Sequence, residues 1–104
     1  MGWVEVVQLR AAESNHNLLD TRLKQLTKGR NRENKQPRIM VYRRAVIPMD
    51  YSIHIIHNDE AVARTGSPLG LHLVAELKEF GLVNHSIWND VTTQFYRHAG
   101  DEKW

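Results

Sequence analysis

Residues 51–88 hold a strand-like segment, a well-delimited helix and a second strand-like segment, and this unit constrains the fold more than any other part of the chain. Residues 51–58 read Tyr-Ser-Ile-His-Ile-Ile-His-Asn, and their β-branched side chains predict a strand. Residues 82–91 alternate well enough between side-chain types to predict another strand. The chain must therefore place at least one helix against a sheet.

The helix between these strands has clear start and stop signals. Ser67 predicts the N-cap, and Pro68 suits the first helical position, where a missing N–H costs nothing. Gly81 predicts the stop. The helix face that we expect to pack on the sheet carries Leu69, Leu73 and Leu77, with Val74 and Phe80 beside them.

The N-terminal half repeats the same order of elements. Residues 3–9 predict a strand that is apolar on both faces, with Val4 and Val6 on one side and Val7 and Leu9 on the other. A helix follows, with Ser14 or Asn15 as its cap, Gly29 as its stop and an apolar stripe of Leu19, Leu23 and Leu26.

Residues 39–47 predict the next strand, and residues 48–50 predict a turn into the strand at 51–58. The connector at 59–66 has room for a short helical turn at residues 60–63. Residues 92–96 could extend the last strand or cross to a partner, and the polar residues 98–104 form a tail.

The resulting order is β-α-β-β-α-β, which predicts an α+β, ferredoxin-like sandwich with an antiparallel sheet and two helices on one face. We expect one domain over residues 1–97, followed by the tail. A chain of 104 residues buries its core economically, so burial against a second copy would add stability.

Composition narrows the chemistry. With 41% hydrophobic and 25% charged residues, the chain fits an ordinary globular class. Because it contains no cysteine, disulfides, thiolate catalysis and cysteine-ligated metals are excluded. No apolar run approaches the roughly 20 residues that span a bilayer, so we expect a cytoplasmic protein without a membrane partner. No metal or cofactor motif is present, and we expect none to be needed.

The chain resembles the dimeric α/β-barrel superfamily, which includes the antibiotic biosynthesis monooxygenase-like and stress-responsive barrel proteins. The resemblance covers roughly residues 3–96. It depends on the element order and on residues 67–74, Ser-Pro-Leu-Gly-Leu-His-Leu-Val, followed by residues 80–88, Phe-Gly-Leu-Val-Asn-His-Ser-Ile-Trp. It implies a homodimer whose two sheets pack face to face, with the helices outside and a cavity in each protomer for a small hydrophobic or aromatic ligand.

The same resemblance implies a choice of activities. Heme-degrading members carry an Asn on the first strand, a Trp near the sheet and a His on the second helix, whereas this chain has Gln8, no Trp within residues 51–58, and only His72 in a comparable place. A cofactor-independent oxygenase would instead need a base to deprotonate a phenolic substrate, which would then react directly with oxygen.

Five residues are the candidates for such a site. His54 and His72 are the candidate catalytic residues because neutral imidazole can act as a base near pH 7. Tyr42, Asn58 and Trp88 are the candidate ligand-binding residues. Each also has a structural interpretation: a hydrogen-bonded histidine, a solvated His72–Glu76 pair, or an aromatic side chain in the core or dimer interface.

A basic segment at residues 24–44 supports an alternative of another class. Its charges could make the protein a non-catalytic dimer that binds a protein partner or nucleic acid. No aromatic residue lies among the charges from Lys24 to Arg38, and Tyr42 and Tyr51 lack the glycine-flanked motif of ferredoxin-like RNA-binding modules, which disfavours nucleic acid.

Overall fold

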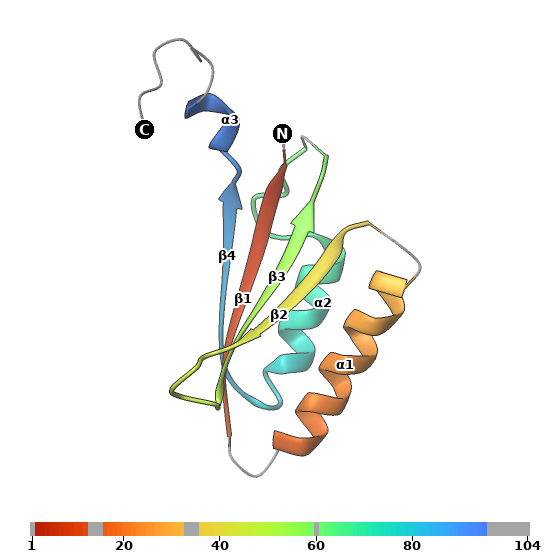
Figure 1. Cartoon of the computed structure of the whole chain (residues 1–104), viewed down its shortest axis with the longest axis vertical. Coiled ribbons are helices and arrows are strands. Elements are labelled where there is room, and N and C mark those ends of the chain that lie inside the picture. The colour runs from red at the N-terminus through yellow and green to blue at the C-terminus, as the bar shows by residue number, and fades with distance from the viewer. Residues whose placement is uncertain (1, 13–15, 33–35, 60, 96–104) are drawn as a thin grey trace.

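The computed structural model of the chain describes residues 2–12, 16–32, 36–59 and 61–95. Four strands form one antiparallel open sheet in the order β2-β3-β1-β4. Three helices accompany it, two of them long enough to cover the sheet (Figure 1). The elements are β1 (Trp3–Ala11), α1 (His16–Arg32), β2 (Arg38–Arg43), β3 (Asp50–His57), α2 (Pro68–Leu77), β4 (Gly81–Asn89) and α3 (Thr92–Phe95).

The α+β class and the antiparallel sheet are therefore confirmed. The central strand β1 pairs with β3 on one side and with β4 on the other, each in an antiparallel register. Strand β2 pairs with β3 and forms one edge, and β4 forms the other edge. Both long helices lie on the same side of this sheet (Figure 1).

The core lies between the helices and one face of the sheet. Because side chains alternate across a strand, every second residue of β1 and β3 points into it. The buried apolar cluster joins Val7, Leu9, Ala11, Ile39, Tyr51, Ile53 and Ile55 from the strands to Leu19, Leu23, Leu73, Leu77 and Phe80 from the helices and the turn before β4. The helical leucines predicted to face the sheet are thus in this cluster or, like Leu26 and Leu69, packed against it.

Only one face of β1 is buried within the single chain. Its buried residues alternate from Trp3 to Ala11, whereas Val4 and Val6 are half-buried and Gln8 is exposed. The reason is that the two long helices cover only one side, and no other element among the described residues covers the opposite side of the sheet.

The C-terminal end of α1 also differs from the prediction. The helix continues through Gly29 to Arg32 instead of stopping at the glycine. A Cβ built on Gly29 would meet no atom within 4 Å, so this glycine lies on an open helix surface and has no special backbone role. The predicted caps Ser14 and Asn15 lie outside the described residues.

The second helix begins as predicted and ends earlier. Ser67 is the N-cap, and its Oγ accepts the Gly70 N–H at 3.0 Å, with Pro68 at the first helical position. The helix ends at Leu77, and Gly81 instead begins β4. The difference arises because residues 78–80 form a turn that brings the chain directly back to the sheet.

Other elements also begin or end at residues that differ from the predicted ones. β2 ends at Arg43, and residues 44–49 form the bend and turn that lead into β3, with Pro48 and Met49 in the turn as expected. Residues 61–63 are not helical. Residues 92–95, for which the sequence left open an extension of the strand or a crossing to a partner, form the short helix α3. The Asp90 carboxylate accepts the Thr92 N–H at 2.9 Å and caps this helix. The tail at 98–104 lies outside the described residues.

Substitution of Gly70 tests how closely α2 packs on the sheet, and Gly29 on α1 provides the control. A methyl group on Gly70 would overlap the buried Glu5 carboxylate of β1, so Gly70→Ala should lower the free energy of unfolding by about 1–3 kcal/mol. Gly29→Ala is the matched control and should raise it by about 0.5–1 kcal/mol, because alanine is the better helix former. Urea denaturation measures both, and equal effects of the two changes would contradict this packing.

Candidate functional site

The side of the sheet away from the helices is here called the open face. The strand registers place even-numbered residues on it in cross-strand rows, such as Val4 beside Ile56 and Trp88, or Gln8 beside Ser52 and Asn84. It comprises Val4, Val6, Gln8 and Arg10 of β1, Arg38, Met40 and Tyr42 of β2, Asp50, Ser52, His54 and Ile56 of β3, and Leu82, Asn84, Ser86 and Trp88 of β4.

One end of the open face is mostly apolar. Val4, Val6 and Ile56 are half-buried there although no helix covers them. Beside them, Trp88 is 60% exposed, and its indole N–H donates to the Ser86 hydroxyl at 2.8 Å. A large aromatic ring next to aliphatic side chains makes this end suitable for contact with another apolar surface.

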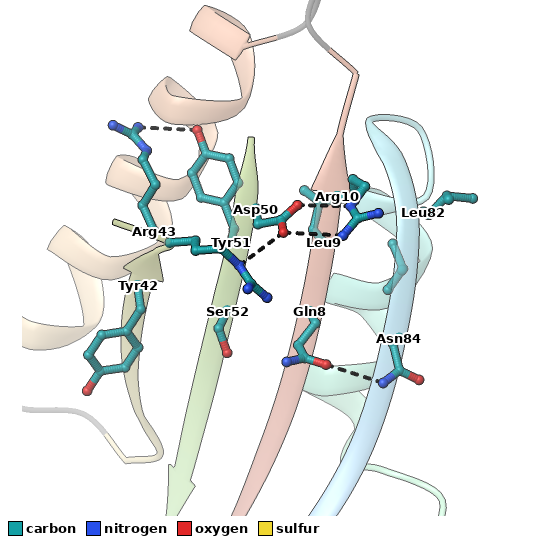
Figure 2. Close-up of a pocket in the computed structure, with 12 residues that line it drawn as sticks. Gln8, Leu9, Arg10, Tyr42, Arg43, Asp50, Tyr51, Ser52, Leu82 and Asn84 are labelled. Atoms are coloured by element: carbon teal, nitrogen blue, oxygen red, sulfur yellow. Dashed lines mark hydrogen bonds and ion pairs between the residues drawn. The ribbon is translucent and has the colours of Figure 1, made fainter. Parts of the chain in front are cut away.

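The other end contains a depression of about 380 Å³, which is called the hollow from here on (Figure 2). Gln8, Ser52 and Asn84 lie in a row across three strands, and Asn84 Nδ2 donates to Gln8 Oε1 at 3.4 Å. Tyr42 lies toward the β2 edge and Leu82 toward the β4 edge (Figure 2). Amides between an aromatic and an aliphatic side chain are typical of small-molecule sites, which often have volumes of about 300–1,000 Å³.

A charged cluster closes one end of the hollow. Asp50 is nearly buried, and its Oδ1 accepts from Arg10 Nε at 3.1 Å while its Oδ2 lies 3.1 Å from Arg44 Nε. Hydrogen bonding and attraction from this carboxylate raise the pKa of Arg10. The Arg10 guanidinium therefore stays charged beside the hollow.

His54 lies on the open face between the hollow and the apolar end. Its Nε2 is 3.0 Å from the Ser52 hydroxyl, and its ring centroid is 4.8 Å from that of Tyr42. Partial burial lowers the pKa of His54 below its ordinary value of 6.5, because removal from water disfavours the charged form. At neutral pH the imidazole is therefore uncharged and can accept a proton.

The five predicted site residues do not all meet. Tyr42, His54 and Trp88 share the open face. Asn58 follows β3 and lines a separate depression with Trp3 and His57. His72 projects from α2 with its side chain 77% exposed, and its Nε2 lies 3.7 Å from the Glu76 carboxylate. The helix is on the covered side of the sheet, so His72 and His54 do not form one site.

The hollow also contains polar residues that the sequence did not single out for it, namely Gln8, Arg10, Asp50, Ser52 and Asn84. Strand parity could have found them once the pairing of β1 with β3 and β4 was known. Their charges and amides are otherwise typical of an exposed sheet surface, which is why no motif marks them.

The basic segment is divided by the fold. Arg43 Nη2 donates to the Asp20 carboxylate at 2.8 Å, and Arg44 is paired with Asp50. The Tyr51 hydroxyl also donates to Asp20, at 2.6 Å. The pKa of Tyr51 is raised mainly by burial and, to a smaller extent, by this hydrogen bond. Part of the positive charge expected to bind a partner is thus used to join strands and helix within the protein.

A buried polar network, which the sequence did not predict, lies between the helices and the sheet. Glu5 is completely buried at the centre of β1, and its carboxylate accepts from His57 Nε2 at 2.7 Å, from His85 Nε2 at 2.9 Å and from the Ser67 hydroxyl. The Trp3 ring stacks on His57 with centroids 3.8 Å apart. We call these four hydrogen-bonded residues, Glu5, His57, Ser67 and His85, the Glu5 network.

The network keeps its carboxylate ionised. Burial by itself raises the pKa of Glu5, but the hydrogen bonds from Ser67, His85 and His57 outweigh it and hold that pKa below the ordinary 4.5. Both imidazoles must then carry a proton on Nε2, since a carboxylate can only accept. The sequence signal was Glu5 at a core-facing position of a strand between Trp3 and Val7.

Neither a metal site nor a membrane span emerges from these residues. Within the described ranges, no three or more histidine or acidic side chains are arranged to hold a metal ion. The helices of the same part of the chain include none that is long and apolar enough to cross a bilayer.

Comparison with protein-family models, with curated proteins and with solved structures found no match to this chain. Its functional interpretation therefore depends on the geometry of the open face and of the hollow.

The Glu5 network gives a pH-dependent stability. Because the folded pKa of Glu5 is depressed, its stabilisation is complete above pH 4.5 and is lost as the pH falls below that value. Glu5→Gln should cost about 1–3 kcal/mol at pH 7, since an amide N–H₂ would face a donor. The difference in unfolding free energy between wild type and variant should shrink toward pH 3. Glu79→Gln, at an exposed position, is the control and should change little at either pH.

Proposed function

We propose that the chain is a ferredoxin-like domain of the dimeric α/β-barrel kind, which pairs with a second copy through the open face and binds a small ligand between the two sheets. The observation that carries this proposal is the one-sided packing of the sheet. Helices cover one face, whereas the other presents Trp88, Val4, Val6 and Ile56 without a covering layer.

A second copy would satisfy two physical requirements. It would remove the exposed Trp88 ring and the half-buried aliphatic side chains from water, which stabilises by roughly 25 cal/mol per Å² of apolar area. It would also supply extra burial to a short chain, which by itself buries a low fraction of its surface. A homodimer related by a two-fold axis is the commonest way for one surface to cover itself.

The hollow gives the dimer a role beyond stability. It is open toward the same side as Trp88, so a covering sheet would turn it into a cavity. Its lining combines Tyr42 and Leu82 with the amides of Gln8 and Asn84, which fits a small ligand with an apolar or aromatic body and some polar groups.

Dimerisation is tested by placing a charge on each side of the sheet. Trp88→Asp should convert a dimer into a folded monomer, because the charge would have to be buried between two apolar surfaces. Leu71→Asp is the matched control, since Leu71 is an exposed hydrophobic residue on α2, and it should leave the dimer intact. Sedimentation equilibrium gives the mass of each. A wild-type protein with the mass of one chain would contradict the proposal.

A second candidate function is a cofactor-independent oxygenase, and the observation that favours it is the environment of His54. Its imidazole is neutral at pH 7 and lies beside Tyr42 and Ser52, both of which line the hollow. In that reaction His54 accepts the proton of a bound phenolic substrate, and the resulting anion reacts directly with dioxygen.

This activity has a direct test in oxygen consumption with phenolic substrates. His54→Ala should lower kcat/KM by about 10²–10⁴-fold, the range for loss of a general base. The acid limb of the wild-type profile should lie below pH 6.5, because the pKa of His54 is lowered. His72→Ala is the control on the opposite side of the sheet and should have no effect. Unchanged turnover in His54→Ala would eliminate this candidate.

A further inference from the structure

The charged end of the hollow carries more positive charge than its own acidic group can balance. Arg10 and Arg44 converge on the single carboxylate of Asp50. Two positive groups and one negative group leave one net positive charge at this end. Asp50 has a side chain only 11% exposed, and one guanidinium would be enough to neutralise it.

Much of the hydrogen-bonding capacity of these guanidiniums is left over. Arg10 donates hydrogen bonds from Nε and Nη2 to Asp50, whereas Arg44 Nε forms an ion pair with Asp50 Oδ2. Among the described residues, no hydrogen bond or ion pair engages Nη1 of Arg10 or either terminal nitrogen of Arg44. The two side chains are 68% and 59% exposed, so these donors are accessible to a solute.

Two other arginines, Arg22 and Arg43, are each paired with a carboxylate that they do not share with another arginine. Arg22 is paired with Glu76 between the two long helices. Arg43 donates to the Asp20 carboxylate, with the Tyr51 hydroxyl beside it. Each of these guanidiniums has a carboxylate of its own, so they serve to hold elements together. Arg10 and Arg44, by contrast, share one carboxylate.

The uncharged lining limits the rest of the ligand. Tyr42 and Leu82 lie on opposite sides of the hollow, and Gln8, Ser52 and Asn84 lie in the row between them (Figure 2). The Gln8–Asn84 bond occupies one amide oxygen and one amide nitrogen, which leaves the Gln8 N–H₂ and the Asn84 oxygen for a ligand. Tyr42 on β2 and Leu82 on β4 are three strand spacings apart, roughly 14 Å, so a single flat ring lies over the row between them and does not touch both.

We propose that the hollow selects a ligand with one anionic group, a carboxylate, bound by the free N–H groups of Arg10 and Arg44, and a flat aromatic body that lies over the row of Gln8, Ser52 and Asn84. Planar guanidinium groups match a carboxylate with two parallel hydrogen bonds, and such charged bonds are among the stronger ones in proteins. This inference depends on the proposed small-molecule function and adds the charge class of the ligand.

The test uses sodium benzoate and its neutral counterpart benzamide as probes of the full chain. Benzoate should shift the backbone amide signals around Gln8, Arg44 and Asn84 in two-dimensional NMR, with a Kd on the order of 1 mM for so small a fragment. Benzamide should bind at least about tenfold more weakly, because it lacks the charge.

Matched arginine variants separate the site from general charge effects. Arg44→Gln removes one cation and leaves Asp50 paired with Arg10, so the fold is kept and benzoate affinity should fall about tenfold. Arg22→Gln removes the same charge on the helical side and should leave affinity unchanged.

The outcomes distinguish the two proposals. Equal binding of benzoate and benzamide in the hollow would overturn the anionic class while supporting a small-molecule site. Equal losses in Arg44→Gln and Arg22→Gln would also overturn it, since the effect would then be one of net charge. Absence of shifts with either probe in a protein that is also monomeric would overturn the function itself.

Discussion

The buried carboxylate of Glu5 is the interaction on which the arrangement of this fold depends. An ionised group without water is stable only if enough donors surround it, and here they come from three different elements. His57 belongs to β3, His85 to β4 and Ser67 to the start of α2, while Glu5 itself lies on the central strand. The charge therefore specifies which strands flank β1 and where α2 begins.

Close packing around this carboxylate accounts for local features of the chain. Gly70 leaves the space that the carboxylate occupies, and Gly66 has a φ of 108°, which brings the connector over Glu5 and His85. Ser67 has two roles, since its oxygen accepts from Gly70 and its hydrogen is donated to Glu5. The helix cap and the core network are one structure.

The second organising fact is that two helices cover one face of a four-stranded sheet. The covered face holds the core and the Glu5 network, whereas the open face has an apolar end with Trp88 and a polar hollow with Arg10, Arg44 and Asp50. The sheet thus separates the buried polar groups of the Glu5 network from the polar groups of the hollow. The proposals for a dimer, a ligand and an anionic group all follow from this asymmetry.

Local signals predicted much of the secondary structure but not its ends. Ser67 and Pro68 correctly marked the start of α2, because capping depends on neighbouring backbone groups alone. Gly29 did not end α1, since a glycine on an open surface weakens a helix only slightly. The short helix α3 depends on the Asp90 carboxylate, a cap that lies just before the helix and outside the alternating pattern of β4.

For the candidate site, alternation along a strand is a local property, and it is enough to put His54 and His57, or His85 and Trp88, on opposite faces of the sheet. Nothing local could show that His72 lies far from His54, or that Glu5 reaches His85 across 80 positions of sequence. The sequence by itself determined the α+β class, the main elements and the two faces of each strand. Only the tertiary structure decided which strands are neighbours and which face the helices cover, because pairing and packing join residues far apart in the chain.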